Sequence, residues 1–237
     1  MAWRSSGLSN LELVTNLKSN GIIKSPEVFR ALTSIDRKNY IDSNPYDDSP
    51  QSLVKGQTIS APHMHAYALG LLETEALREN ASILDVGIGS GYLSAAFARL
   101  NPTAICTGID VVPDLVSMAR ANVLKEDSDL MDRLQIPDAC NGWKGYPQNA
   151  PYDAIHVGAA AAELPPDLMS QLKVGGKMII PVGPDGGDQV LVQVVRERGD
   201  CENVDVISSD EQQIDLSHFS ITKLMGVRYV PLVNRDA

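Results

Sequence analysis

Cysteine, aromatic residues and positive charge are all scarce in this sequence of 237 residues. The cysteines number 3 and are widely spaced, at Cys106, Cys140 and Cys201, so they form no Cys-x-x-Cys pair and no zinc-ligand pattern. We therefore expect no metal site and a reducing compartment. Lys and Arg number 20 against 30 Asp and Glu, and the formal net charge is −10. Because no basic cluster offsets this charge, we expect no nucleic-acid partner.

Long hydrophobic runs are also absent. No stretch reaches the roughly 18 apolar residues that a membrane span requires, and residues 1–7 lack the apolar core of a signal peptide. We therefore expect a cytosolic protein with no membrane partner, and a monomer. Hydrophobic residues still make up 43% of the chain, so a chain of this length can bury a sizeable core as a single domain.

Helical patterns dominate residues 1–78, whereas strands and helices alternate over residues 79–237. In the first part, the sequence predicts helices over 10–19, from 26 onward and over 63–74, with a loop over 44–57. In the second part it predicts strands over 82–86, 104–110, 152–157, 177–182, 189–195 and 224–230, and helices over 93–100, 113–125 and 166–172. Such alternation is typical of a doubly wound, mostly parallel sheet. The acidic segment 197–215 is expected to be a solvated surface loop.

The strongest local motif is Asp85-Val-Gly87-Ile-Gly89-Ser-Gly91, which lies between a predicted strand and a predicted helix. Glycines in this place let the backbone turn tightly and let a ligand approach the amino terminus of the helix. A dinucleotide fingerprint needs a small residue where this chain has Tyr92, and a P-loop needs a Gly-Lys-Ser/Thr ending that is absent. The motif favours S-adenosylmethionine, because Asp110 can accept hydrogen bonds from two ribose hydroxyls and Asp85 can face the cationic amino-acid moiety.

A second motif, Thr58-Ile-Ser-Ala-Pro-His-Met-His65, stands at the start of a predicted helix. Two interpretations of Ser60 are open: an N-cap that accepts from a free helix amide, or a hydroxyl that holds an anion at the helix amino terminus. His63 and His65 are two positions apart, so on a helix they point to different faces and do not form a metal pair. A third stretch, Ile155–Ala161, places small residues after a predicted strand, which suits either a ligand site or close packing against a helix.

Several longer stretches carry a resemblance to a known family. They are Met1–Arg4, Asn44–Tyr46, Thr58–Ala68, Ile83–Gly87, Ala150–Ala161, Pro181–Pro184 and Leu224–Leu232. Together they make the chain resemble the protein-L-isoaspartate (D-aspartate) O-methyltransferases over nearly its whole length. The glycine loop alone indicates only a class I methyltransferase, whereas the stretches Thr58–His65 and Ala150–Ala159 are far more specific.

The resemblance implies a class I S-adenosylmethionine-dependent methyltransferase fold. It implies a seven-stranded sheet whose carboxyl-terminal part departs from the usual strand order, and an N-terminal helical region that partly covers the site. It also implies S-adenosylmethionine as cofactor, S-adenosylhomocysteine as product, and isoaspartyl-containing proteins and peptides as substrates. Ser60 corresponds to the family's active-site serine. The residues that the resemblance places at the cofactor are Gln57, Thr58, Ile59, Ser60, His65, Asp85, Gly87, Gly89, Ser90, Gly91, Asp110, Val111, Asn141, Gly142 and Val233.

Three departures from the family pattern matter. The glycine loop has Ile88 where the family favours serine, which removes one hydroxyl near the cofactor. Asn141 stands where an aspartate commonly contacts the adenine amino group, and it keeps an acceptor oxygen without the charge. Val233 stands where a threonine is usual, so a polar contact is lost. Another class I methyltransferase, or a non-catalytic adaptor with this fold, therefore stays as an alternative, whereas Tyr92 disfavours a nicotinamide oxidoreductase. The expected acceptor is an α-carboxylate with a pKa near 3.5, which is ionised at neutral pH and needs no general base.

Overall fold

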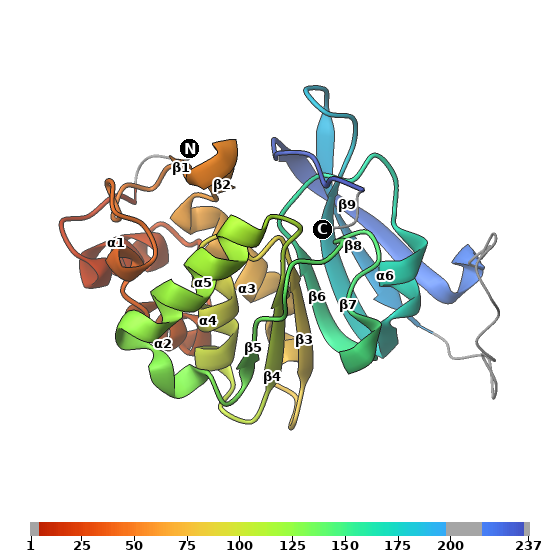
Figure 1. The fold of residues 1–237 in the computed structure, drawn as a ribbon, viewed down its shortest axis with the longest axis horizontal. Coiled ribbons are helices and arrows are strands. Elements are labelled where there is room, and N and C mark those ends of the chain that lie inside the picture. The colour runs from red at the N-terminus through yellow and green to blue at the C-terminus, as the bar shows by residue number, and fades with distance from the viewer. Residues whose placement is uncertain (1–4, 198–214, 235–237) are drawn as a thin grey trace.

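A mixed sheet of seven strands runs through the middle of the molecule (Figure 1). The computed structural model describes residues 5–197 and 215–234. Along the sheet the order is β5-β4-β3-β6-β7-β8-β9; the strands from β5 to β7 are parallel, and β8 and β9 are each antiparallel to the strand before. The strands are β3 (Ser82–Val86), β4 (Ile105–Ile109), β5 (Leu134–Gln135), β6 (Tyr152–Val157), β7 (Leu172–Val182), β8 (Gln189–Arg196) and β9 (Phe219–Val227). The predicted class I methyltransferase fold is confirmed, and its last strands lie in chain order.

Helices cover both faces of this sheet, as Figure 1 shows. The helices are α1 (Asn10–Ser19), α2 (Pro26–Ser34), α3 (Pro62–Ala76), α4 (Tyr92–Leu100), α5 (Pro113–Glu126) and α6 (Pro166–Ser170). Ile83 of β3 packs in one core cluster with residues of α1 to α5, while its neighbour Leu84 packs in a second cluster with Leu168 of α6. Adjacent strand residues point to opposite faces, so a strand covered on both faces reads as a continuous apolar run. The predicted strand 82–86 is such a run and is confirmed.

The first two helices begin as their sequences predict. Ser9 accepts a hydrogen bond from the Glu12 N–H at 3.2 Å, and Ser25 accepts from the N–H groups of Glu27 and Val28. These serines satisfy amides that have no partner inside their helices. The two caps fix the residues at which α1 and α2 begin. α1 packs on α2, and α2 packs on α4.

Some expected boundaries differ from the observed ones. The loop predicted over 44–57 contains a short strand β1 (Gln51–Ser52), which pairs with β2 (Thr58–Ile59), and a 3₁₀ turn η2 (Val54–Gly56). The strand predicted over 224–230 is β9 over Phe219–Val227, because pairing with β8 sets its register, with an irregularity between Leu191 and Val192. The predicted helix 166–172 ends at Ser170, since β7 begins at Leu172. Residues 198–214 of the acidic segment 197–215, which is expected to be a surface loop, lie outside the described residues.

The remaining short elements are 3₁₀ turns, at η1 (Arg37–Asn39), η3 (Ser128–Leu130), η4 (Pro147–Asn149) and η5 (Leu216–His218). In the part of the chain that the structure describes, no helix is both long and apolar enough to cross a membrane. The division at residue 78 and the single-domain organisation stay predictions.

Candidate active site

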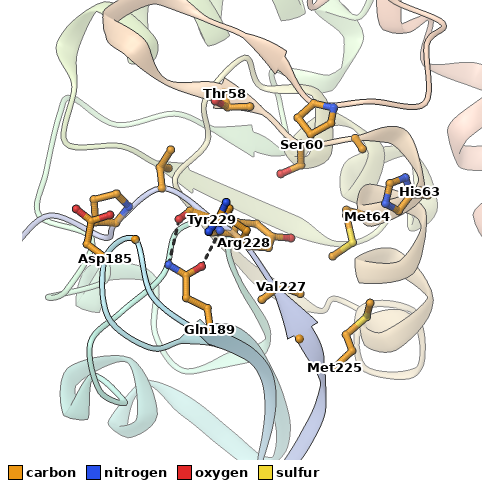
Figure 2. A pocket seen from close by; sticks show the side chains of 17 residues that line it. Thr58, Ser60, His63, Met64, Asp185, Gln189, Met225, Val227, Arg228 and Tyr229 are labelled. Carbon is orange, nitrogen blue, oxygen red and sulfur yellow. Dashed lines mark hydrogen bonds between the residues drawn. The ribbon is translucent and has the colours of Figure 1, made fainter. Parts of the chain in front are cut away.

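Three adjoining cavities open where β3, β4 and β6 end. The Asp110 cavity, of about 80 Å³, is lined by the glycine loop, Asp110 and Val233, among others. The His65 cavity, of about 30 Å³, is lined by His65 and Asp85 on the inner side of the same loop. The groove, of about 610 Å³, runs past Ser60 toward the chain after β9 (Figure 2). Thr58 and Gly158 line all three spaces, so the three meet at these two residues.

Glycine is required where the loop after β3 turns. Gly87 and Gly89 have φ angles of +83° and +54°, in the left-handed region that side chains disfavour. The N–H groups of Gly87 and Ile88 both donate to the Ile109 carbonyl, at 2.8 and 2.9 Å, which ties the loop to the end of β4. A Cβ atom at Gly158 would lie 3.3 Å from the Gly87 carbonyl oxygen, so the loops after β3 and β6 touch at this point. The close packing of Ile155–Ala161 at Gly158 is thus against a loop rather than against a helix, and its interpretation as a ligand site stays a prediction.

Asp110 has the position that its predicted role requires. Its carboxylate accepts from the N–H of Gly89 at 3.2 Å and from the N–H of Val112 at 3.0 Å. Burial raises the pKa of Asp110, and these hydrogen bonds oppose the rise. Val111, Leu115 and Val233 supply apolar walls to the same cavity. A carboxylate acceptor beside an apolar slot suits a ribose with an attached flat base, because the ribose hydroxyls can donate to it and the base can pack in the slot.

Asp85 lies on the inner side of the loop and is held on both of its oxygens. Oδ1 pairs with His156 Nδ1 at 2.7 Å, and Oδ2 accepts from the Ser94 hydroxyl. Only 1% of Asp85 is exposed. The carboxylate therefore has a fixed orientation at the His65 cavity, and its predicted contact with a cationic moiety stays a prediction.

A fully buried guanidinium organises the other side of the His65 cavity. Arg37 donates from Nη2 to the Ser60 carbonyl at 2.7 Å and from Nη1 to His65 Nδ1 at 3.1 Å, and it stacks over the Tyr92 ring at 4.9 Å. Burial lowers the pKa of Arg37 to about 10, so it stays charged at neutral pH. Burial and this neighbouring charge hold the pKa of His65 well below its usual value. His65 is thus neutral, accepts on Nδ1 and carries its proton on Nε2.

The start of α3 is built differently from its prediction. The N-cap residue is Ala61, which has no side-chain cap, so the interpretation of Ser60 as an N-cap is wrong. Pro62 has no N–H, and the His63 N–H donates to the Asp48 carboxylate at 2.9 Å. The next two N–H groups, of Met64 and His65, donate to the Ala61 carbonyl. No helix amide is therefore free beside Ser60 to hold an anion.

Most of the residues predicted to bind the cofactor line the Asp110 and His65 cavities. They are Gln57, Thr58, Ile59, Ser60, His65, Asp85, Gly87, Gly89, Ser90, Asp110, Val111, Gly142 and Val233.

Two of the predicted residues lie outside these cavities, and their contacts with the cofactor stay predictions. Gly91, at φ +89°, does not line either cavity; it packs on α5, where an added Cβ would lie 3.2 Å from the Ala119 Cβ. Asn141 also lies outside both cavities. Its oxygen accepts from the Trp143 N–H at 3.0 Å and its amide donates to Asn234, so the side chain stabilises a turn.

Sequence reasoning missed several residues of the site. Arg37 and Asp48 come from segments with no motif, and only the folded chain brings them to α3. His156 was visible in the stretch Ile155–Ala161, and Tyr229 in Leu224–Leu232, but neither had a signal for a role. Within residues 5–197 and 215–234, no group of three or more His, Cys, Asp or Glu side chains could hold a metal ion.

Comparisons with known proteins agree with this geometry. The family model described as protein-L-isoaspartate(D-aspartate) O-methyltransferase matches residues 8–237. The chain is 39% identical to the protein-L-isoaspartate O-methyltransferase of Caenorhabditis elegans, over 100% of this chain and 97% of that protein. It is also 39% identical to protein-L-isoaspartate O-methyltransferase 1 of Arabidopsis thaliana, over 99% and 96% of the two chains.

A solved structure extends this similarity to three dimensions. A Plasmodium falciparum protein that carries the same family name, crystallised with S-adenosyl-L-homocysteine, matches with a TM-score of 0.82 and 31% identity, over 97% of this chain and 100% of that one. Sequence and fold thus agree over nearly the full length. The chain belongs to the protein-L-isoaspartate(D-aspartate) O-methyltransferase family.

Proposed function

We propose that this protein methylates the free α-carboxylate of L-isoaspartyl and D-aspartyl residues in damaged proteins and peptides, with S-adenosylmethionine as the methyl donor. The observation that carries the proposal is the meeting of three spaces at Thr58 and Gly158, with Ser60 lining both the groove and the His65 cavity. Two of these spaces suit the parts of a nucleoside cofactor, and the groove, open and larger, suits a peptide. The family relationship and the ligand of the Plasmodium relative support the same reaction.

The residues present fit this cofactor. Asp110 would accept from the ribose hydroxyls, and the walls of Val111, Leu115 and Val233 would contact the adenine ring. His65, neutral and donating from Nε2, would face the amino-acid end together with the fixed carboxylate of Asp85. When bound, the cofactor supplies an electrophilic methyl group whose bonding electrons return to sulfur as the methyl leaves.

The chain has little chemistry to perform beyond orientation. An α-carboxylate is ionised at neutral pH, so its oxygen is already a nucleophile and no general base is needed. The Ser60 hydroxyl would donate to one carboxylate oxygen, and the buried Arg37, bonded to the Ser60 carbonyl, would fix the backbone that carries it. Alignment of this kind can contribute several kcal/mol to a displacement reaction.

The methyl ester is the activated form from which repair proceeds. It cyclises to a succinimide without the enzyme, and hydrolysis of the ring returns part of the residue to normal aspartate. Because the lesion occurs in many sequences, the groove would contact the main chain of the substrate peptide more than its side chains. We further propose a cytosolic location and a monomer.

A matched pair of peptides tests the proposal. The protein should transfer a methyl group from S-adenosylmethionine to a peptide with one isoaspartyl residue, and should leave the same peptide with normal aspartate unmethylated. Ser60→Ala should lower the rate with the isoaspartyl peptide by about tenfold or more, since it removes a donor to the carboxylate. Equal methylation of the two peptides would overturn the assignment, because the normal peptide has no free α-carboxylate at that residue.

A further inference from the structure

The groove needs a second hydrogen-bond donor beside Ser60. A carboxylate has two oxygens that together accept several hydrogen bonds, and Ser60 offers one hydroxyl. The amides at the start of α3 do not supply more, because His63 donates to Asp48 and the following N–H groups donate to Ala61. The opposite wall of the groove, which is formed by the chain around and after β9, is another source of donors.

Tyr229 lies on that wall. Ser60 and Tyr229 both line the groove, and Figure 2 shows them among its side chains, Ser60 next to α3 and Tyr229 in the segment after β9. Burial raises the pKa of the Tyr229 hydroxyl to about 12, and contact with the Ser60 side chain opposes this rise. The phenol therefore keeps its proton at neutral pH and is available as a donor.

The main chain of Tyr229 is fixed by a buried side-chain amide. Gln189, the first residue of β8, accepts from the Tyr229 N–H at 2.6 Å and donates to the Tyr229 carbonyl at 3.2 Å. The same amide donates to the Pro184 carbonyl at 3.3 Å, and only 3% of Gln189 is exposed. In the sheet, Gln189 pairs with Val227, the last residue of β9. The side-chain bonds of Gln189 therefore extend the contact between β8 and this part of the chain by two residues, to Tyr229.

The chain after Tyr229 is held from the other side as well. The Ala160 N–H donates to the Val230 carbonyl at 2.8 Å, and the Leu232 N–H donates to the Ala160 carbonyl at 2.7 Å. Ala160 follows β6, so the segment that carries Tyr229 is bonded to both β8 and the loop after β6. A donor on such a segment is preorganised, and little entropy is lost when it binds an anion.

We propose that the Tyr229 hydroxyl is a catalytic donor that binds the substrate carboxylate together with the Ser60 hydroxyl, and that Gln189 is a positioning residue that holds Tyr229 for this contact. The proposal rests on the function proposed above, since it needs a carboxylate acceptor in the groove. Each wall of the groove then supplies one donor: Ser60 on the wall next to α3, and Tyr229 on the wall formed by the segment after β9. The carboxylate would bind between them.

Tyr229→Phe tests the donor, because it removes one oxygen and keeps the ring. Its kcat/KM for an isoaspartyl peptide should fall about tenfold or more, while the dissociation constant for S-adenosylhomocysteine, measured by calorimetry, should change less than about twofold. Tyr67→Phe is the matched control, because Tyr67 lies on α3 beside a separate cavity lined by Ile22 and Val28. It should leave both quantities unchanged. An unaltered kcat/KM in Tyr229→Phe, with an active native protein, would overturn the proposal.

A double-mutant cycle tests Gln189. Gln189→Met keeps the size of the side chain and removes both hydrogen bonds to Tyr229, so kcat/KM should fall in the native background. In the Tyr229→Phe background the same change should cost much less, because the hydroxyl that Gln189 positions is already gone. An equal loss in both backgrounds would show that Gln189 acts on the groove in another way. Failure of the native protein to methylate the peptide would instead contradict the proposed function.

Discussion

Among single residues, Asp110 and Asn141 differ in whether the sequence predicts the position of the side chain at the cofactor cavity. Asp110 follows directly after a buried strand whose end is set by hydrophobic pattern, so its place at the cavity could be predicted from the sequence. Asn141 stands in a loop between short elements, where no pattern fixes the direction of a side chain. Its oxygen accepts from the Trp143 N–H two residues further on, a local bond that competes with any ligand contact.

Asp110→Ala should weaken binding of S-adenosylhomocysteine by about 1.5–3 kcal/mol, the usual contribution of hydrogen bonds to a charged group. Titration calorimetry on the native protein and the variant measures this directly. Asn141→Ala is the matched control, because Asn141 lies outside both cofactor cavities, and its affinity should stay close to native. An Asp110→Ala protein that binds as well as the native one would remove Asp110 from the ribose site.

At the scale of elements, the start of α3 depends on a residue far away in the sequence. Asp48 is 1% exposed and accepts from both the N–H and the ring Nδ1 of His63, so a carboxylate 15 residues earlier satisfies the helix end. Ser60 is close in sequence and of a residue type that caps helices, yet it does not cap this one. Local pattern predicts which helix forms, whereas the choice of capping partner depends on tertiary packing.

Asp48→Ala should therefore lower the free energy of unfolding by about 1–3 kcal/mol, because it leaves the partly buried His63 N–H without its acceptor and removes the carboxylate that faces buried Arg37. Ser60→Ala should change it by less than about 0.5 kcal/mol. Urea unfolding followed by circular dichroism compares the two variants. Similar losses in both would mean that Ser60 stabilises α3 after all.

The strands show the same division between local and tertiary causes. β3, β4 and β6 are buried runs between turn signals, so the sequence predicts them to within two residues of their observed ends. β9 was predicted five residues late, because its side chains are half-buried or exposed and carry no clear period. Its position comes from pairing with β8, which no local pattern encodes.

At the scale of the whole molecule, the net charge of −10 opposes an acidic substrate. The groove has no local excess of positive charge: within the described part of the chain, Arg228 is the single Lys or Arg that lines it, and it is exposed at the wall that carries Tyr229. Asp185 lies in the same lining, so the groove has charges of both signs. Hydroxyl donors fixed by buried bonds, rather than net attraction, would then select the carboxylate.

Conversion of an isoaspartyl peptide to the aspartyl form is the decisive test of the proposed repair activity, because repair requires methylation at the α-carboxylate and nowhere else. The peptide is incubated with the protein and S-adenosylmethionine at neutral pH, and chromatography follows the isoaspartyl, succinimide and aspartyl forms. We expect the isoaspartyl form to decline through the succinimide while the aspartyl form accumulates, and we expect omission of the methyl donor to abolish the change. A peptide that stays isoaspartyl, or that is esterified at another carboxyl group, would contradict the proposed repair activity.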